Sequence, residues 1–422
     1  MDRPVKFFEC LYPVTACNLK CEYCYVIQEE RRWNKIENLL YPVETMLKGL
    51  TKERLGGICF FSICGAGETL VPDEIIPLIY GLLKEGHYVN ITTNGTIVKK
   101  FNQILEFPSE FQERLHFSFS LHYKELKQRN LLSVFKDNVK KIQKTKKISF
   151  FVQFNMYDGY LPYLEEIKNF CIENFGAPPQ ICATRNMRTP EVELLTSKNK
   201  TEYFNLGKDF NSKLFEMTNR QFMKKQTHFC YAGRFTYSLD LKTGILKPCY
   251  CSSIKQNIFE DLTSPILDCP VGFNCTDPYC FNSSHFISLG TVPDIDCPSY
   301  GELRNRPEAK WQTKKIKEFL SQKFYKNFPN KIIDKKYEKI ASELYLQKNL
   351  ISKIEQENSC LRNQNNELLN KINENSNTID KITIEKQAIQ NEKDAILNSA
   401  SYKITKPLRF VKKVAKKILR RK

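Results

Sequence analysis

Three cysteines near the start of the chain, Cys17, Cys21 and Cys24, have a spacing suited to metal chemistry. They lie in the segment CNLKCEYCY, directly after an apolar stretch with the character of a strand. Thiolates at this spacing on a loop can hold three irons of a cubane [4Fe–4S] cluster. Because such clusters normally take four cysteine ligands, a set of three leaves one iron open to a small molecule. A zinc site and three unrelated buried thiols are the alternatives.

The C-x3-C-x2-C spacing, with Tyr23 directly before the last cysteine, resembles the signature of the radical S-adenosylmethionine (SAM) superfamily. The resemblance implies that the open iron chelates the amino and carboxylate groups of SAM. It also implies that one electron, from a donor such as flavodoxin or ferredoxin, cleaves SAM to a 5′-deoxyadenosyl radical. In that family the radical abstracts hydrogen from a substrate.

Strand-like apolar runs alternate with helical patterns from residue 5 to about residue 224. The expected strands are 5–14, 57–64, 88–93, 115–121, 148–156 and 180–184. Amphipathic stretches such as 72–84, 131–144 and 161–174 separate them, with apolar residues at helical spacing. Six strand–helix repeats predict an α/β fold, a partial (βα)6 TIM-type barrel over residues 1–225. In such barrels chemistry gathers where loops leave the carboxyl ends of the strands.

Three further motifs follow the next expected strands. They are Gly65-Ala66-Gly67-Glu68-Thr69, Thr92-Thr93-Asn94-Gly95-Thr96 and Ser118-Phe119-Ser120-Leu121-His122. They resemble the family's Gly-Gly-Glu, Thr-Asn-Gly and Ser-x-Asp segments, with Ala66 and His122 as departures from the pattern. The resemblance implies that SAM is bound by Gly65, Gly67, Glu68, Thr93, Asn94, Ser120 and Tyr23. Small residues also let a backbone approach a ligand closely.

A second cysteine-rich block covers residues 226–305. Cys230, Gly244 and Cys249 are spaced C-x13-G-x4-C, with 237–240 and 243–244 reading as a hairpin. This spacing resembles the opening of the auxiliary extensions called SPASM and twitch, which implies a second [4Fe–4S] cluster held by Cys230, Cys249 and two later cysteines. The later candidates are Cys269, Cys275, Cys280 and Cys297. The alternative is a structural zinc site formed by Cys269, Cys275, Cys280 and His285.

Composition bears on the compartment and on the partners. The chain has sixteen cysteines, and its first residues contain no apolar signal segment, so we expect metal ligation in the cytoplasm rather than disulfides. No apolar run is long enough to span a bilayer. The formal net charge of +18 is concentrated at the end of the chain, where residues 401–422 contain ten Lys or Arg and no acid. We therefore expect no specific nucleic-acid binding by the core.

A heptad pattern runs through residues 340–398, after an expected helical linker at 306–339. With Leu344 at position a, ten of the sixteen a and d positions from 344 to 396 are aliphatic. Asparagine at a positions, as at Asn358 and Asn365, favours a parallel two-stranded coiled coil. We predict a homodimer; the alternative is a single long solvated helix.

Residues 399–422 form an expected basic tail, with Pro407 in the first turn of a short helix. Its apolar face predicts attachment to an anionic membrane surface, on the inner face of the membrane. Nucleic acid and an acidic partner are the alternatives. Residues 401–409 also resemble a C-terminal sequence found on some bacterial glycosyltransferases and surface-polysaccharide proteins.

These features together predict a radical SAM enzyme acting on a small-molecule or glycan substrate. The tail resemblance favours oxidation or epimerisation of a carbohydrate or nucleotide-sugar in surface-polysaccharide synthesis. One alternative is a SPASM-type peptide-modifying maturase. Another is a non-catalytic, metal-containing scaffold for polysaccharide enzymes. The sequence assigns no residue as the hydrogen donor or general base.

Overall fold

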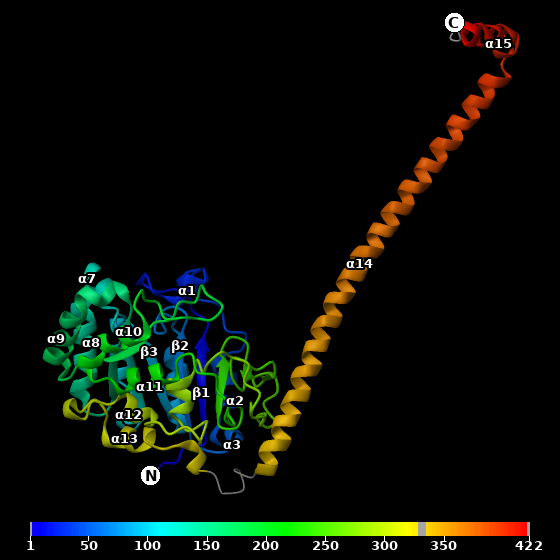
Figure 1. Cartoon of the computed structure of the whole chain (residues 1–422). Coiled ribbons are helices and arrows are strands. Elements are labelled where there is room, and N and C mark those ends of the chain that lie inside the picture. Colours follow the sequence, from blue (N-terminus) through cyan, green and yellow to red (C-terminus); the bar gives the residue numbers. More distant parts are fainter. Residues whose placement is uncertain (1, 328–334, 420–422) are drawn as a thin grey trace. The chain divides into compact units, whose positions relative to one another are not determined.

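The six expected strands form one parallel sheet in the computed structural model, which describes residues 2–327 and 335–419 (Figure 1). The strands are β1 (Lys6–Tyr12), β2 (Cys59–Gly65), β3 (Tyr88–Thr93), β4 (Leu115–Ser120), β5 (Ser149–Met156) and β6 (Gln180–Ala183). Each lies beside its neighbour in sequence, in the order β6-β5-β4-β3-β2-β1, and every pair is parallel. This is the strand order of a partial TIM-type barrel, so the α/β prediction is confirmed.

Helices connect the strands. They are α1 (Tyr25–Gln28), α2 (Val43–Gly49), α3 (Lys52–Leu55), α4 (Ile75–Glu85), α5 (Val98–Leu105), α6 (Ser109–Gln112), α7 (Tyr123–Gln128), α8 (Leu132–Thr145) and α9 (Leu164–Phe175). After β6 follow α10 (Lys200–Leu206), α11 (Lys213–Gln221), α12 (Tyr300–Arg304) and α13 (Lys314–Leu320). Short turns of 3-10 helix cover Asp158–Tyr163, Lys208–Phe210, Pro307–Ala309 and Phe324–Asn327, and a π-helical turn covers Ser283–Ile287.

Helix α4 shows why these segments form helices. Its buried residues Ile75, Leu78, Ile79, Leu82 and Leu83 recur at the spacing of one helical face. The helix ends at Gly86, whose φ of 97° is a left-handed conformation that glycine adopts without a steric penalty. The next strand therefore starts two residues later, directly beside β2.

The two faces of the sheet have different characters. Phe8 and Cys10 of β1 pack in the larger core with the crossover helices, whereas Phe7 packs on the opposite face with Phe286 and Phe319. Polar residues on three adjacent strands contact one another at the middle of this second face. Asn90 Nδ2 donates to Ser62 Oγ at 2.9 Å, and Ser118 Oγ donates to Asn90 Oδ1 at 2.8 Å. These bonds satisfy polar groups that burial would otherwise penalise.

The cysteine-rich block continues the same sheet instead of forming the separate domain expected at 226–305. β7 (Thr236–Asp240) pairs in parallel with β1, and β8 (Ile245–Lys247) and β9 (Gln256–Asn257) extend the sheet by antiparallel pairing. The result is a nine-stranded sheet within one compact unit, Met1–Asn349. The expected hairpin is therefore present, but its first strand is anchored to the barrel.

Residues 306–327, expected as part of a helical linker, belong to the core of this unit. Trp311 is 1% exposed, and its Nε1 donates to the carbonyl of Phe175 at 2.9 Å. Phe319 and Phe324 are also buried. The sequence does not indicate this packing, because many lysines separate these apolar residues and obscure a periodic apolar pattern. The rest of the expected linker includes residues 328–334, which lie outside the described residues.

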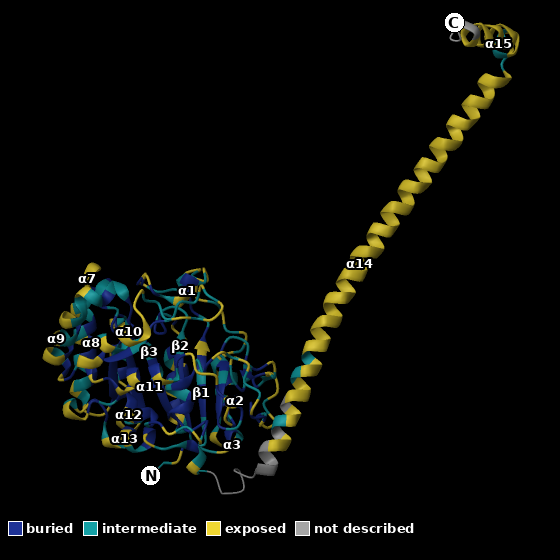
Figure 2. Ribbon diagram, in the orientation of Figure 1, coloured by how far each residue is buried: buried dark blue, intermediate teal, exposed yellow. Residues whose placement is uncertain are grey.

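A second unit, Leu350–Lys422, contains most of α14 (Lys335–Asn398) and all of α15 (Ala400–Leu419). At ~1.5 Å per residue, α14 is roughly 96 Å long. The expected seam residues are exposed in this single chain, including Ile351, Leu361 and Ile372 at 56%, 56% and 61% (Figure 2). The continuous helix is confirmed, and its pairing with a second copy stays a prediction.

The tail helix starts earlier than expected. Ser399 caps α15, because its Oγ accepts from the Tyr402 backbone N–H at 3.2 Å. Pro407 consequently lies inside the helix and not in its first turn. None of the described helices is both long enough and apolar enough to cross a membrane.

The two tryptophans provide a test of how the core is completed. Trp311→Ala is expected to lower the free energy of unfolding by about 3–5 kcal/mol, because it leaves a cavity in the core. Trp33, which is 58% exposed, is the matched control, and Trp33→Ala should change the free energy by less than about 0.5 kcal/mol. Urea denaturation followed by circular dichroism measures both. Equal effects of the two substitutions would contradict the packing of residues 306–327 on the barrel.

Candidate active site and candidate metal centre

The first cysteine group lies on the loop that leaves the carboxyl end of β1. Cys24 directly precedes α1, and its N–H donates to the carbonyl of Cys21 at 3.0 Å. Arg32 Nη2 donates to the carbonyls of Cys17 and Leu19 at 3.0 and 2.8 Å. The loop is therefore held by its own backbone and by one guanidinium group.

Burial shapes the chemistry of these thiols. It raises the pKa of Cys17 and, more strongly, that of Cys21. The Glu125 carboxylate and the neighbouring Cys17 and Cys24 thiols raise the pKa of Cys21 further. Without a metal the thiols of Cys17 and Cys21 are therefore protonated at neutral pH, and metal binding must release protons.

The glycine loop after β2 packs against the cysteine loop. Gly67 N–H donates to the carbonyl of Val14 at 2.6 Å, and Glu68 N–H donates to that of Ala16 at 2.9 Å. A Cβ on Gly67 would lie 2.2 Å from the carbonyl oxygen of Ala16, and one on Gly65 would lie 2.4 Å from Val14 Cγ1. Both glycines are thus needed for the approach of two protein loops. Their contact with SAM stays a prediction.

Glu68 joins the glycine loop to the turn after β3. The residue is 2% exposed, and three donors surround its carboxylate. Thr93 Oγ1 and Leu70 N–H donate to Oε1 at 2.6 and 3.0 Å, and Asn94 N–H donates to Oε2 at 2.7 Å. Burial raises the pKa of Glu68, and these bonds counteract the rise. In this structure Glu68 holds two loops together through these hydrogen bonds, and its contact with SAM stays a prediction.

Asn94 connects the turn after β3 to the first cysteine. Its Nδ2 donates to Asn18 Oδ1 at 2.8 Å and lies 3.8 Å from Cys17 Sγ, where it also donates. Asn18 Nδ2 in turn donates to Thr96 Oγ1 at 2.9 Å. Hydrogen bonds to cysteine sulfur tune the potential of iron–sulfur clusters. Asn94 is therefore placed to orient Cys17 and to adjust its electron density.

Tyr23 and His122 form a buried polar contact beside the cysteine loop. The Tyr23 hydroxyl lies 2.5 Å from His122 Nδ1 and 3.4 Å from the Tyr160 hydroxyl. Burial lowers the pKa of His122 to about 4, so its ring is neutral at physiological pH. The aromatic ring of Tyr23 is 4% exposed. His122, which departs from the acid of the motif that this segment resembles, is thus a neutral hydrogen-bonding partner of Tyr23.

Ser120 ends β4, one strand further along the sheet, and is partly exposed. The Ser120 hydroxyl forms no hydrogen bond with any other described residue. Together with the cysteine loop, the glycine loop and the Asn94 turn, it occupies the carboxyl edge of four successive parallel strands. The structure therefore brings together the first-site residues expected from the sequence at the edge where barrel chemistry occurs.

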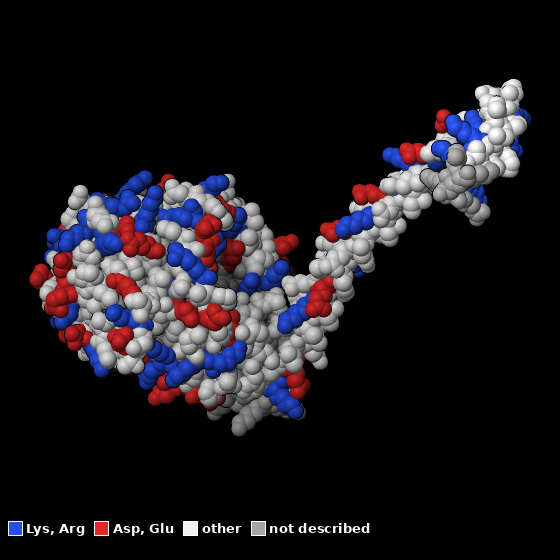
Figure 3. All heavy atoms as spheres, turned by 45° about the horizontal axis from the view of Figure 1, so that its top comes forward, with Lys and Arg blue, Asp and Glu red and all other residues white. Residues whose placement is uncertain are grey.

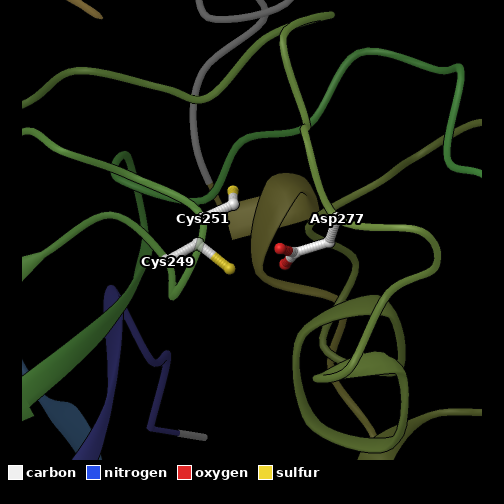
Figure 4. A group of neighbouring side chains, drawn as sticks. All are labelled: Cys249, Cys251 and Asp277. Carbon is white, nitrogen blue, oxygen red and sulfur yellow. The ribbon is translucent and has the colours of Figure 1, made fainter. Parts of the chain in front are cut away.

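The second cysteine group surrounds a small internal cavity of about 20 Å³. Cys230, Cys249, Cys251, Cys275 and Cys280 line it, together with Asp277. Ligand atoms of Cys249, Cys251 and Asp277 lie within 4.8 Å of one another, and Figure 4 shows these side chains converging. Asn282 Nδ2 donates to Cys249 Sγ at 3.7 Å. Each cysteine group thus has one asparagine amide directed at a sulfur atom.

Three of the thiols in this cavity interact directly, because Cys251 contacts both Cys249 and Cys275. Hydrogen bonding with Cys249 raises the pKa of Cys251 to about 12, and burial raises that of Cys230 to about 12. Hydrogen bonding with Cys251 raises the pKa of Cys275 well above its usual range. The five cysteines that line the cavity suit iron–sulfur clusters or zinc, because both prefer thiolate ligands.

The residues that line the cavity agree in part with the ligands expected from the sequence. Cys230, Cys249, Cys275 and Cys280 gather at the cavity, but Cys269 and Cys297 do not line it. Cys297 Sγ instead donates to the carbonyl of Ile287 at 3.4 Å and accepts from Lys323 Nζ at 3.3 Å.

Two cavity residues were not expected from the sequence, Cys251 and Asp277. Their only sequence signal is position, because Cys251 is two residues from Cys249, and Asp277 lies between Cys275 and Cys280.

His285, part of the alternative zinc set, lies elsewhere. Its Nδ1 is 3.4 Å from Glu9 Oε1 on β1, and it does not line the cavity. The neighbouring residues Phe286 and Ile287 do line it. The contact of His285 with Glu9 therefore ties the cavity wall to the central strand of the barrel.

Comparisons with known proteins give only distant similarity. No family model and no curated protein matches the chain. Streptococcus suis SuiB bound to S-adenosylmethionine is a similar solved structure, with 16% identity over 62% of this chain and 64% of that chain, and a TM-score of 0.45. This chain therefore spans less than two thirds of the length of SuiB.

Two other solved structures are similar to the chain. Native anSMEcpe with bound AdoMet and Cp18Cys peptide shares 16% identity over 61% of this chain and 79% of that chain, with a TM-score of 0.43. TYW1 with a lysine-pyruvate adduct bound shares 14% identity over 48% and 72% of the two chains, with a TM-score of 0.33. At these scores the site geometry, and not the similarity, supports the function proposed below.

Glu68→Gln tests the hydrogen bonds by which Glu68 connects the glycine loop to the Asn94 turn. The amide nitrogen would face one of the three donors, so we expect the free energy of unfolding to fall by about 1–3 kcal/mol. Glu74→Gln is the control, because Glu74 is exposed on the same connection and should change stability by less than about 0.5 kcal/mol. Denaturant titration measures both. Equal stability of the Glu68→Gln variant and the natural protein would show that the hydrogen bonds of the Glu68 carboxylate do not stabilise the fold.

Proposed function

We propose that this chain is a radical SAM enzyme. The observation that carries the proposal is the attachment of the Cys17, Cys21 and Cys24 loop to the glycine loop and the Asn94 turn at the carboxyl edge of the sheet. Three thiols there fit a [4Fe–4S] cluster with one open iron. When SAM binds at that iron, its reductive cleavage supplies a 5′-deoxyadenosyl radical that removes hydrogen from the substrate.

The residues of the chain position these groups. Arg32 and Asn94 orient the cysteine loop through its carbonyls and the Cys17 sulfur. The partly exposed Ser120, at the end of β4, supplies a hydroxyl as a binding group for the cofactor in our proposal. Tyr23 and His122 form a neutral contact beside the cysteine loop.

The cavity lined by Cys230, Cys249, Cys251, Cys275 and Cys280 holds a second metal centre in our proposal, an iron–sulfur cluster. Five converging sulfur donors and the amide of Asn282 support it. A redox-active group at this site can accept the electron that a substrate radical releases on oxidation. The reaction class we favour is therefore net oxidation, with epimerisation as its redox-neutral counterpart.

For the substrate we propose a carbohydrate or nucleotide-sugar of surface-polysaccharide synthesis. The support is the resemblance of residues 401–409 to C-terminal sequences of surface-polysaccharide proteins. The electron for SAM cleavage comes from a small carrier such as flavodoxin or ferredoxin. Faster 5′-deoxyadenosine formation on adding nucleotide-sugars is expected. Acceleration by a cysteine-containing peptide alone would contradict this substrate class.

Metal content tests both cysteine groups. Anaerobic reconstitution should give about eight irons per chain, as expected for two [4Fe–4S] clusters. Cys17→Ala/Cys21→Ala/Cys24→Ala should keep about four irons and lose SAM cleavage. Cys249→Ala/Cys251→Ala should also lose about four irons, because these thiols lie at the centre of the second group.

Cys269→Ala and Cys297→Ala are the matched controls for this measurement. Both cysteines are buried in the same region but do not line the cavity, so all iron should remain. One zinc with about four irons would make the second centre structural. Absence of iron from every variant would overturn the proposed function.

We also propose that α14 pairs with a second copy of the chain. A stripe of aliphatic seam residues, each close to or above half exposed, supports a parallel two-stranded coil. Sedimentation equilibrium of the full chain should give about twice the chain mass of 49.5 kDa.

Substitutions at Ile382 and Ile384 distinguish pairing through the seam from general hydrophobic association of the helices. Both isoleucines are exposed in the single chain, Ile382 at 58% and Ile384 at 70%. Ile382 occupies a d position of the seam, whereas Ile384 lies on the outer face of the helix. Ile382→Glu should therefore produce a monomer, whereas Ile384→Glu should leave the dimer intact. A dimer that survives both substitutions would refute pairing through this seam.

A further inference from the structure

Helix α15 has two faces of opposite character. Its apolar face contains Ile404, Leu408, Val411 and Val414, which are 73%, 70%, 64% and 42% exposed. Their spacing places them along one side of a helix. No part of the described chain covers this face. A contiguous patch of exposed apolar side chains marks a surface that binds a membrane or another protein.

The opposite face is strongly basic. α15 contains Lys403, Lys406, Arg409, Lys412, Lys413, Lys416 and Lys417 and no acidic residue. The Arg409 guanidinium lies 4.8 Å from the centre of the Tyr402 ring. By contrast, acidic and basic side chains alternate along α14 (Figure 3). Of these two C-terminal helices, only α15, which also has the exposed apolar face, therefore carries an excess of positive charge.

These two features together restrict the partner. A second copy of α15 would bring two strongly basic helices together, at an electrostatic cost. Nucleic acid would use the charges but leave the apolar face in water. An anionic lipid surface satisfies both faces, because the apolar side chains enter the acyl region while Lys and Arg reach the headgroups. Each such cation near an anionic surface contributes about 1 kcal/mol.

We propose that α15 lies in the plane of an anionic membrane and attaches the protein to it. Pro407 does not prevent this arrangement, because the helix continues through it. The Ser399 cap starts α15 as a helix distinct from α14, so the amphipathic segment has its own axis. The inference is independent of the chemistry proposed for the barrel.

Vesicle flotation of the full chain tests this inference. The protein should float with vesicles of phosphatidylcholine and phosphatidylglycerol but not with vesicles of phosphatidylcholine alone, and added salt should weaken binding. Leu408→Gln/Val411→Gln leaves the charge unchanged and removes two exposed apolar side chains that would enter the acyl region. Binding should fall at least about 100-fold, since each such side chain is worth about 1.5–3 kcal/mol on burial.

The control variant is Ile384→Gln, an equally exposed isoleucine on the outer face of α14, which should float like the natural protein. Iron content and SAM cleavage should be the same in all three proteins, which excludes misfolding. Flotation of Leu408→Gln/Val411→Gln at natural affinity would overturn the proposal in favour of purely electrostatic binding. Failure of the natural protein to float with anionic vesicles would overturn it outright.

Discussion

The parallel pairing of β1 with β2 on one side and β7 on the other positions the first cysteine loop and the hairpin that leads to Cys249 and Cys251. The first cysteine loop leaves the carboxyl end of β1, and the glycine loop leaves β2 in register beside it. On the other side, β7 leads through its hairpin to Cys249 and Cys251. One hydrogen-bonded strand therefore positions both cysteine groups. A change in the register of either pairing would move one group relative to the other.

Close backbone contact explains why small residues occur beside the cysteine loop. Gly67 donates to Val14 and leaves no room for a side chain against Ala16. Buried Glu68 then connects this contact to Asn94, whose amide reaches Cys17. The loops form a chain of hydrogen bonds in which each member depends on the next. Such preorganisation keeps ligands in place before a cofactor binds.

The C-terminal helices follow a different physical rule from the barrel. The barrel buries its apolar side chains within one unit, whereas α14 and α15 expose theirs in stripes (Figure 2). Exposed stripes of this size are stable only when another surface covers them. The seam of α14 fits a second helix with mixed charges, and the strongly basic α15 fits an anionic surface. The two helices thus differ in partner because they differ in charge pattern.

The sequence by itself determined the six barrel strands, the first cysteine group and the long helix, because periodicity, local spacing and turn residues encode them within short segments. It did not reveal that β7 joins β1, that Trp311 completes the core, or that Cys251 and Asp277 line the second cavity. These depend on contacts between residues far apart in the chain. Among many cysteines of similar spacing, only the folded sheet decided that Cys269 and Cys297 lie away from the cavity that the other thiols share.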